Sequence, residues 1–392
     1  MDDVTNDVTN DVMNDAMAIQ TRPAPRLLFQ IRNRRGLGHM MRGLNIATAL
    51  RGIDPQVRID FHLRTPPGTG FWPADLGLTV DDPQDPNHPQ RGWRATVERV
   101  DPDVIVFDTL LPEPDEVGSD RAALAFVMRE CLPEEQRALH AHALIERIGC
   151  FLVPHEAGDY GPVPEALSAR TFCVGTIRRS TSAAAQQALR QRLALGEDTF
   201  VLTSTVGGGG FTAQAERFFE IVREAHQRLA PVFAAFDRPV AHLLIQGPNY
   251  AGTVPALPGL RVIASEPELV SLLALSDLVI AEGGYNTVNE ILDTRTPALF
   301  LPSARGKDDQ HARVRLLAEA GRAEVLDATR EDAGERLAAS VHALLADPRR
   351  LADMRHAAAR TPPPRRGNEE AAQRLHALAL QRMQATRCEI SP

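Results

Sequence analysis

The chain has few cysteines, and their positions exclude two classes of protein. Only four occur in 392 residues, and they are scattered along the sequence at Cys131, Cys150, Cys173 and Cys388. No pair has the spacing of zinc ligands or of a disulfide framework. We therefore expect reduced thiols in a cytoplasmic protein.

Long hydrophobic runs and an excess of basic charge are also missing. No apolar stretch approaches the roughly 20 residues that span a membrane, and no basic-then-apolar signal opens the chain. The formal net charge is -8, which argues against a nucleic-acid partner because such a partner needs a broad basic face. We expect a cytoplasmic protein without a membrane span and without a nucleic-acid partner.

The chain is long enough for two domains, each with a sizeable core. Residues 1–25 repeat a polar Asp-Val-Thr-Asn unit, and we expect them to be disordered because they cannot bury enough surface. A polar segment of small residues at 178–185 is typical of a linker. The boundaries predicted are an N-terminal domain at 26–177, a C-terminal domain at 186–360, and a proline-rich break with a last helix at 361–392.

Short apolar strands alternate with helical patterns in both halves, which predicts an α/β protein with parallel sheets and right-handed crossovers. The carboxyl ends of strands in such sheets line the ligand crevice. The region 66–93 is rich in Pro, Gly and Asp, and we expect a long loop there with little regular structure.

The most informative segment is an apolar strand followed by Gly283, Gly284 and a helical pattern. The two glycines allow the backbone to approach a ligand, and Asn286 or Thr287 is placed to cap the helix. The unpaired N–H groups and dipole of a helix start attract an anion. Glu290, one turn further on, is placed to accept a hydrogen bond from a sugar hydroxyl. The alternative is a turn that merely needs small residues.

A second strand, glycine turn and helix occurs near the start of the chain. Gly38 is followed directly by His39, whose pKa range suits a general base. Asp108 ends an apolar strand and is placed to orient that histidine, and Arg42 is placed to hold a phosphate or a carboxylate. A histidine that only lines a turn and an aspartate that only caps a loop are the alternatives.

Two further segments of the second half follow strands. Gly208 and Gly209 are the middle pair of four glycines, which form either a hinge or a loop that wraps a phosphate or sugar. Their position before a helix favours the ligand role. Asp308, Asp309 and Gln310 precede or begin another helix and offer acceptors to sugar hydroxyls, although one aspartate can simply act as an N-cap.

Together these segments resemble a nucleotide-sugar glycosyltransferase of the GT-B fold. The glycine loop, the Gly-Gly-Tyr-Asn-Thr signature with its glutamate, and the Asp-Asp-Gln segment are similar to family 28 enzymes such as the bacterial cell-wall N-acetylglucosaminyl transferase. The first glycine turn also resembles that of UDP-sugar hydrolases in nonulosonic acid synthesis. The resemblance implies two facing Rossmann-like domains with the active site in the cleft between them, and a last helix that packs back on the N-terminal domain.

The resemblance also implies a donor site in the second domain. Gly283 and Gly284, with the N–H groups that follow, would bind the diphosphate of a nucleoside-diphosphate sugar, most often UDP. Glu290 would bind the ribose and Ile263 the base through its backbone. The residues that would hold the donor sugar are Asp309 and Gln310.

The chemistry implied is transfer of the sugar to a hydroxyl or amine of a small-molecule or glycan acceptor. His39 would take the acceptor proton, with inversion of configuration and with no cofactor or bound metal. Secondary-metabolite and envelope-glycan synthesis are both compatible. Glu282, an acidic residue beside the diphosphate site, departs from the family pattern. Two alternatives therefore stay open, a nucleotide-sugar hydrolase and a non-catalytic protein that binds sugar nucleotides.

Overall fold

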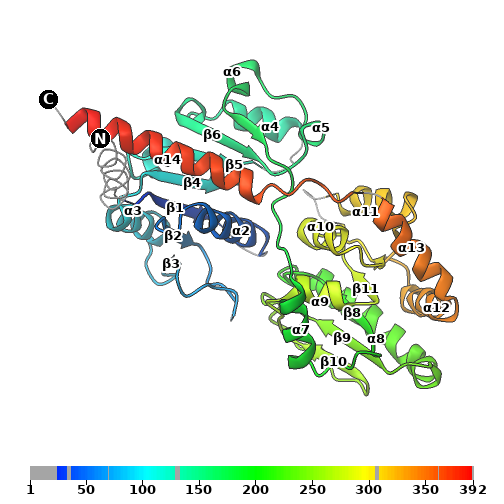
Figure 1. The fold of residues 1–392 in the computed structure, drawn as a ribbon. Helices are drawn as coiled ribbons and strands as arrows, with labels where there is room; N and C mark the ends of the chain where they lie inside the picture. Colours follow the sequence, from blue (N-terminus) through cyan, green and yellow to red (C-terminus); the bar gives the residue numbers. More distant parts are fainter. Residues whose placement is uncertain are drawn as a thin grey trace, which may run out of the picture.

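A computed structural model describes residues 24–32, 37–68, 70–128, 133–304, 309–360 and 362–390. Within these ranges the chain forms two separate parallel sheets with helices on both faces (Figure 1). This confirms the predicted α/β fold. The N-terminal repeat lies almost wholly outside the described residues, as do Gly36, Cys131 and Asp308.

The first sheet has seven strands in the order β3-β2-β1-β4-β5-β6-β7, and every neighbouring pair is parallel. The central strands are buried and almost entirely apolar because helices cover both faces. The strands are β1 Arg26–Ile31, β2 Arg58–Leu63, β3 Gly77–Val80, β4 Val104–Asp108, β5 Ala123–Val127, β6 Ile148–Val153 and β7 Thr171–Cys173. The α-helices of this domain are α2 Gly38–Ile53, α3 His88–Val100, α4 Pro133–His140, α5 Ala157–Tyr160 and α6 Glu165–Ser168, with 3-10 turns η1 Pro114–Glu116 and η2 Ile145–Arg147.

The second sheet has six parallel strands in the order β10-β9-β8-β11-β12-β13. Its central strand β11 carries the apolar run that precedes Gly283. The strands are β8 Phe200–Thr205, β9 Val240–Ile245, β10 Leu260–Ile263, β11 Leu278–Ala281, β12 Ala298–Phe300 and β13 Ala323–Val325. The helices of this domain are α7 Ala183–Arg192, α8 Thr212–Ala235, α9 Leu269–Leu275, α10 Tyr285–Thr294, α11 Gln310–Glu319, α12 Ala333–Ala346 and α13 Pro348–Arg360. The last helix, α14 Asn368–Ile390, packs on the first domain.

The prediction of a long irregular loop at 66–93 was wrong. Strand β3 lies inside this region and pairs in parallel with β2, and α3 begins at His88. The strand is short, only partly buried and opens on Gly77, so its own residues give a weak strand signal. Gly77 has a packing reason, since a Cβ there would lie 2.2 Å from Asp60 Oδ1. Pairing with β2, which is distant in sequence, orders the segment.

The chain crosses between the domains twice, and the two crossings are hydrogen-bonded to each other. Thr176 N–H donates to the Arg365 carbonyl (2.8 Å), and Gly367 N–H donates to the Thr176 carbonyl (2.8 Å). The Asn368 side chain completes the contact with two hydrogen bonds to the Arg178 backbone, of 3.0 and 2.9 Å. The predicted linker at 178–185 begins with Arg178, at the end of this contact, and runs into α7 at Ala183.

Helix α14 returns to the first domain and lies across its sheet (Figure 1). Its small apolar residues pack against α2 and join the core that covers this face, at Ala371, Ala372, Leu375 and Ala379. Small side chains permit close approach of the two helices. The last segment of the chain therefore belongs structurally to the first domain.

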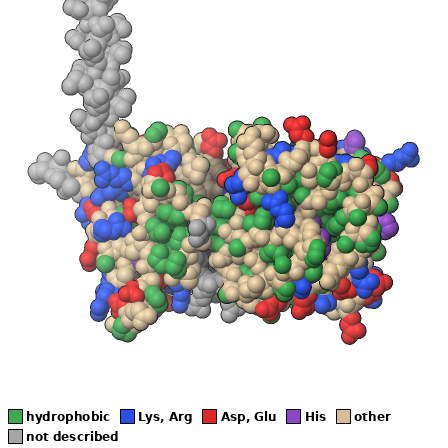
Figure 2. Space-filling model, turned by 90° about the horizontal axis from the view of Figure 1, so that it is seen from below, with side chains coloured by type: hydrophobic (Ala, Val, Ile, Leu, Met, Phe, Trp, Pro, Cys, Tyr) green, Lys and Arg blue, Asp and Glu red, His purple; other side chains and the backbone are tan. Residues whose placement is uncertain are grey.

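The surface and the helices bear on the expected partners. Acidic and basic side chains are interspersed over the face shown in Figure 2, without a broad patch of one sign. No helix among the described residues is long and apolar enough to span a bilayer.

A pair of buried histidines lies in the core of the second domain. His226 Nδ1 and His242 Nδ1 are 3.0 Å apart, and His242 Nε2 lies 2.8 Å from Ser204 Oγ. Burial, together with the neighbouring His226, lowers the pKa of His242 to about 3. Between about pH 6.5, where an unfolded histidine gains a proton, and about pH 3, His242 is therefore neutral in the folded protein.

This pair predicts acid sensitivity of the second domain. Between the folded pKa of about 3 and the unfolded value of about 6.5, the unfolded chain binds the extra proton. Stability is therefore complete above pH 6.5 and falls as the pH drops below it. From pH 7.5 to 5.0 we expect His242 to account for a loss of about 2 kcal/mol in urea unfolding. His242→Gln should remove that part of the pH dependence, whereas His356→Gln, at an exposed site, should keep it. Equal slopes for all three proteins would contradict the argument.

Candidate active site

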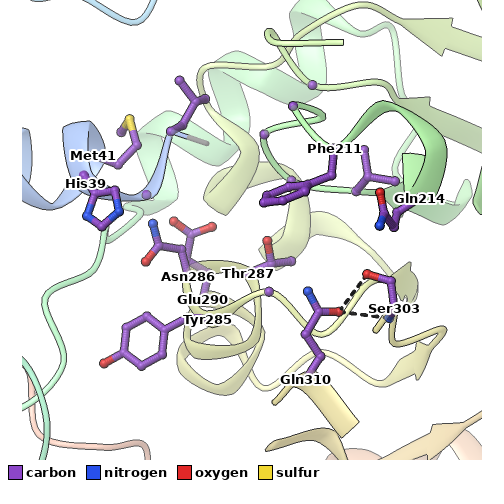
Figure 3. A pocket seen from close by; sticks show the side chains of 18 of the residues that line it. His39, Met41, Phe211, Gln214, Tyr285, Asn286, Thr287, Glu290, Ser303 and Gln310 are labelled. Atoms are coloured by element: carbon purple, nitrogen blue, oxygen red, sulfur yellow. Dashed lines mark hydrogen bonds between the residues drawn. The ribbon is translucent and has the colours of Figure 1, made fainter. Parts of the chain in front are cut away.

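A cleft of about 1750 Å³ separates the two domains and is lined by both of them. The first domain contributes the start of α2, and the second contributes the glycine loop after β8 and the starts of α10 and α11 (Figure 3). These are the carboxyl ends of parallel strands, where ligands bind in open α/β sheets. The residues predicted to act that line the cleft are Gly38, His39, Arg42, Gly208, Gly284, Asn286, Thr287, Glu290, Asp309 and Gln310.

The side chains of His39, Asp108 and Arg42 meet on the first-domain side of the cleft. His39 Nδ1 lies 2.7 Å from Asp108 Oδ1. Arg42 donates to the same carboxylate through Nε (2.9 Å) and Nη2 (2.5 Å). The predicted pairing of His39 with Asp108 is therefore present in the structure. Arg42, which we expected to hold a phosphate or a carboxylate, binds the Asp108 carboxylate.

The charges in this cluster keep Asp108 ionised. Burial alone raises the pKa of Asp108, but the charges of Arg42 and His39 and their hydrogen bonds outweigh it and hold the pKa well below its usual value. Burial likewise lowers the pKa of Arg42, and the Asp108 charge and hydrogen bond reverse this, so that its net pKa is raised. The ionised carboxylate therefore accepts a hydrogen bond from His39 Nδ1–H, and this tautomer leaves Nε2 as a base.

Thr109 is a member of this cluster that the sequence analysis missed. Its hydroxyl lies 2.7 Å from Asp108 Oδ1 and 3.0 Å from His39 Nδ1, and it accepts from Arg42 Nη2 at 3.0 Å. Its φ is +68°, a left-handed conformation that β-branched residues rarely adopt. Such strain persists where the surrounding structure enforces it.

Helix α10 begins at the cleft without a side-chain cap. Gly284 is its N-cap residue, and no side chain accepts from the first turn. The prediction that Asn286 or Thr287 caps this helix was wrong, because the helix begins at Tyr285 and both residues lie inside its first turn. N–H groups in a first turn have no acceptor within the helix. The start of α10 thus presents donors and a positive dipole end to the cleft.

The two glycines before α10 have different roles. A Cβ on Gly283 would lie 2.9 Å from Gln310 Cβ and 2.9 Å from Val314 Cγ1, so this glycine is required for packing against α11. Its N–H donates to Gln310 Oε1 (3.2 Å), which contradicts its expected place among the diphosphate donors. A Cβ on Gly284 would meet nothing within 4 Å, because this residue faces the open cleft.

The glycine loop after β8 divides in a similar way. Gly208 lines the cleft together with Gly207 and Gly210. Gly209, which has a φ of +74°, packs away from the cleft, and a Cβ there would lie 2.6 Å from the Gln246 carbonyl. Gly209 therefore shapes the loop, whereas Gly208 borders the space where a ligand would lie.

Gln310 is fully buried at the start of α11, and its amide bridges two loops. Oε1 accepts from Gly283 N–H (3.2 Å) and from Ser303 N–H (3.1 Å), as Figure 3 shows for Ser303. Nε2 has no hydrogen-bond partner within the described part of the chain. Asp309 acts as the N-cap of α11, with Oδ1 accepting from Ala312 N–H at 2.9 Å, and also borders the cleft. Asp309 therefore caps α11, as the alternative predicts, and also borders the cleft.

Glu290 lies on the cleft wall, but its carboxylate already has a partner. Arg179 donates to both oxygens, from Nε at 2.8 Å and from Nη2 at 3.2 Å. Burial lowers the pKa of Arg179, and the charge and hydrogen bond of Glu290 outweigh it, so that the net pKa is raised. Sequence analysis placed Arg179 in a linker and gave it no role. Each carboxylate oxygen retains a further lone pair for a ligand.

Ile263, which we expected to contact the nucleotide base through its backbone, does not lie where that prediction requires. It ends β10, its carbonyl accepts from Gln246 N–H (3.0 Å), and it is not among the residues that line the cleft. The residues that line the cleft just beyond it are Glu266 and Leu269. Glu282, the departure from the family pattern, is 3% exposed and does not line the cleft either.

Tyr285 connects the two walls. Its hydroxyl donates to the Pro154 carbonyl of the first domain (2.6 Å), and its ring packs edge-on against His155 at 5.2 Å. Arg313 lies over the same ring, 5.5 Å from its centroid, and donates to the Gly283 carbonyl at 2.8 Å. Burial, and then the charges of Arg42 and Arg313, lower the pKa of His155 to about 4. His155 is therefore neutral at neutral pH.

Residues 205–376 match the glycosyltransferase family 28 C-terminal domain. The relatives include N-acetylglucosamine transferases with the full name UDP-N-acetylglucosamine--N-acetylmuramyl-(pentapeptide) pyrophosphoryl-undecaprenol N-acetylglucosamine transferase. That of Desulforudis audaxviator is 32% identical over 43% of this chain and 46% of its own length, so the match spans about half of that relative. That of Mycobacterium tuberculosis H37Rv is 27% identical over 88% of this chain and 86% of its own length.

Solved structures show the same fold over most of the chain. The forosaminyltransferase SpnP has a TM-score of 0.57 at 17% identity and covers 91% of this chain and 99% of its own. MurG of Acinetobacter baumannii has a TM-score of 0.51 at 17% identity and covers 92% and 100%. The chain is a glycosyltransferase of the GT-B fold. It resembles the cell-wall N-acetylglucosaminyl transferase, as its glycine turns predicted.

Removal of the Thr109 side chain tests its role in the glycosyltransferase. Thr109→Gly releases a strained φ, which costs about 1 to 3 kcal/mol for such a residue, but also removes the hydroxyl that contacts His39 and Asp108. We expect equal or higher thermal stability with a kcat about tenfold lower, and Thr109→Ser should retain most of the activity. Full activity in the glycine variant would show that the hydroxyl has no function.

The two glycines before α10 predict opposite outcomes. Gly283→Ala forces Cβ against α11 and should destabilise the protein by about 1 to 3 kcal/mol, as overpacked cores do. Gly284→Ala meets open space in an unstrained backbone, with φ -62° and ψ 139°. It should leave the melting temperature unchanged and weaken donor binding. Thermal denaturation with and without nucleotide checks both, and a destabilised Gly284→Ala would refute the distinction.

Proposed function

We propose that this glycosyltransferase moves a sugar from a UDP-sugar to an acceptor hydroxyl or amine. The observation that carries the proposal is the uncapped first turn of α10, which lies across the cleft from the His39–Asp108 pair. One wall offers anion donors and the other offers a base. The printed names of the relatives include UDP-N-acetylglucosamine, which supports UDP as the nucleotide.

The donor would lie along the second domain. Its diphosphate would accept from the N–H groups of Asn286 and Thr287 and face Gly208 and Gly284. Its ribose would donate to Glu290, and its base would occupy the end of the cleft near Glu266 and Leu269. The sugar would then reach Asp309 and Gln310. Nε2 of Gln310 has no partner among the described residues and could donate a hydrogen bond to a sugar hydroxyl oxygen.

The reaction would be a single displacement at the anomeric carbon. The acceptor oxygen or nitrogen attacks that carbon, and its bond to the diphosphate oxygen breaks with the electron pair staying on the diphosphate. The acceptor proton passes to His39 Nε2, and Asp108 stabilises the imidazolium through Nδ1. Attack from the face opposite to the leaving group inverts the configuration.

We also propose that the leaving diphosphate needs no metal ion. The dipole and N–H groups of α10 point to where its negative charge develops, in a site that the fold has already organised. The prediction is that EDTA leaves kcat/KM unchanged. A loss of activity with EDTA that Mg²⁺ or Mn²⁺ restores would contradict it.

Nucleotide binding tests the donor site directly. UDP, GDP and TDP, free and as sugar conjugates, are added to the full chain and the melting temperature is measured. A ligand at a hundredfold excess over its Kd stabilises the folded state by about 2.7 kcal/mol. We expect UDP to raise the melting temperature, and Glu290→Gln should reduce this shift. The control Glu319→Gln, which removes the same charge at an exposed site, should leave the shift unchanged. No shift with any nucleotide would refute the donor site.

His39→Ala separates binding from chemistry. The variant should retain the UDP shift and lose about 10²- to 10⁴-fold in turnover, which is the usual contribution of a general base. Product analysis without acceptor distinguishes transfer from hydrolysis, because a hydrolase releases free sugar rapidly. Unchanged turnover in His39→Ala would remove the base from the proposal.

A further inference from the structure

A second, smaller pocket of about 90 Å³ lies in the first domain, at the carboxyl end of β1 and β2. We call it the arginine pocket, and the residues that matter here are Gln30, Arg32, His62, Arg64, Asp81 and Glu116. Arg32 lines both this pocket and the interdomain cleft. Since β1 pairs with β4 so that Ile31 lies beside Asp108, the pocket opens on the same sheet edge as the proposed base.

Among the described residues, the arginine pocket has two arginines without an ion pair, Arg64 and Arg94. Arg94 is exposed and donates to the Asp115 carbonyl at 3.2 Å. Asp81 is bound by His62 Nε2 at 2.8 Å. Glu116 accepts from Arg32 at 3.4 Å and from Gln90 at 3.1 Å. Arg64 forms no ion pair with any residue that the structure describes. In a chain with a net charge of -8, an unpaired arginine in a concave site indicates an anionic partner.

An unpartnered buried amide faces the same space. Gln30 is 5% exposed at the end of β1, and its Oε1 has no hydrogen-bond partner among the residues that the structure describes. Buried polar atoms are nearly always hydrogen-bonded, and an exception calls for a ligand or a water. Rotation of the amide exchanges its oxygen for its NH2 group, so that the NH2 group can donate a hydrogen bond to an oxyanion in the pocket.

We propose that the arginine pocket binds an oxyanion of the acceptor, a carboxylate or a phosphate. Arg64 and Arg32 supply the charge, and Gln30 orients the group. A volume of about 90 Å³ equals the liquid volume of roughly three waters, which suits one such group. This proposal rests on the proposed function in one respect, that the oxyanion belongs to the acceptor. The pocket itself belongs to the first domain and not to the donor site.

Small oxyanions serve as probes. Inorganic phosphate and acetate are titrated by calorimetry into the full chain saturated with UDP, so that the anion site at α10 is occupied, and again without UDP. We expect one of the two ions to bind in the presence of UDP. Arg64→Met and Gln30→Leu should each weaken it about tenfold or more, and Arg64→Lys should restore part of the affinity. Arg91→Met, an exposed arginine of α3 outside the pocket, is the matched control.

The outcomes separate the two proposals. Binding of phosphate alone or of acetate alone identifies the acceptor group as a phosphate or a carboxylate. No binding of either ion, or binding that Arg64→Met leaves unchanged, overturns the arginine pocket as an anion site. Failure of UDP itself to bind overturns the proposed donor site instead, and the titration without UDP then still decides the pocket through its Arg64 variants. If Gln30→Leu does not fold, the Arg64 series gives the answer.

Discussion

The geometry of the cleft depends on the contact between the two chain crossings. Arg178, whose side chain is 2% exposed, donates to Asp293 of α10 at 2.9 Å and to the Pro364 carbonyl at 2.9 Å. It therefore joins the outgoing linker, the returning segment and the helix that begins at the cleft. Arg366 of the returning segment also pairs with Asp293. The crossings hold α10 near its carboxyl end, at Asp293. Its first turn, at the other end of the helix, is therefore directed at the first domain.

Two buried ion pairs then place the carboxylates of the cleft, one in each domain. Arg42 fixes Asp108, and Arg179 fixes Glu290, each with two hydrogen bonds from one guanidinium to both oxygens of the carboxylate. A buried pair is weak evidence for stability because desolvation offsets the attraction. Its value here is positional, since a planar guanidinium sets the orientation of a carboxylate in a way that a lysine does not. In the first domain the oriented carboxylate faces a histidine, and in the second it faces the ligand space.

Periodicity and glycine turns predicted much of this architecture because both are local. An apolar strand, two small residues and a helical pattern specify their own geometry, so the start of α10 and that of α2 were recognisable. Strand β3 was not, because only its pairing with β2 orders it. Nor was Arg179, which meets Glu290 across a long sequence separation, or the left-handed backbone of Thr109, since threonine gives no signal for it. The separate roles of Gly283 and Gly284 required the position of α11, which no local pattern contains.

At its binding edge each domain keeps one buried amide group without a hydrogen-bond partner among the described residues, Gln310 Nε2 in the second and Oε1 of Gln30 in the first. An unsatisfied buried polar atom costs about 1 to 3 kcal/mol, so neither is explained by the stability of the free protein. Gln310 Nε2 is a donor that faces the proposed sugar, and rotation of the Gln30 amide presents its NH2 group as a donor to an oxyanion in the arginine pocket. A ligand group that accepts a hydrogen bond from the amide removes this cost. A ligand without such a group leaves the amide atom desolvated and unpaired. The two amides that destabilise the free protein would thus discriminate between ligands. For the same reason, polar sites reject a substrate that lacks one hydroxyl far more strongly than apolar sites reject one that lacks a methylene.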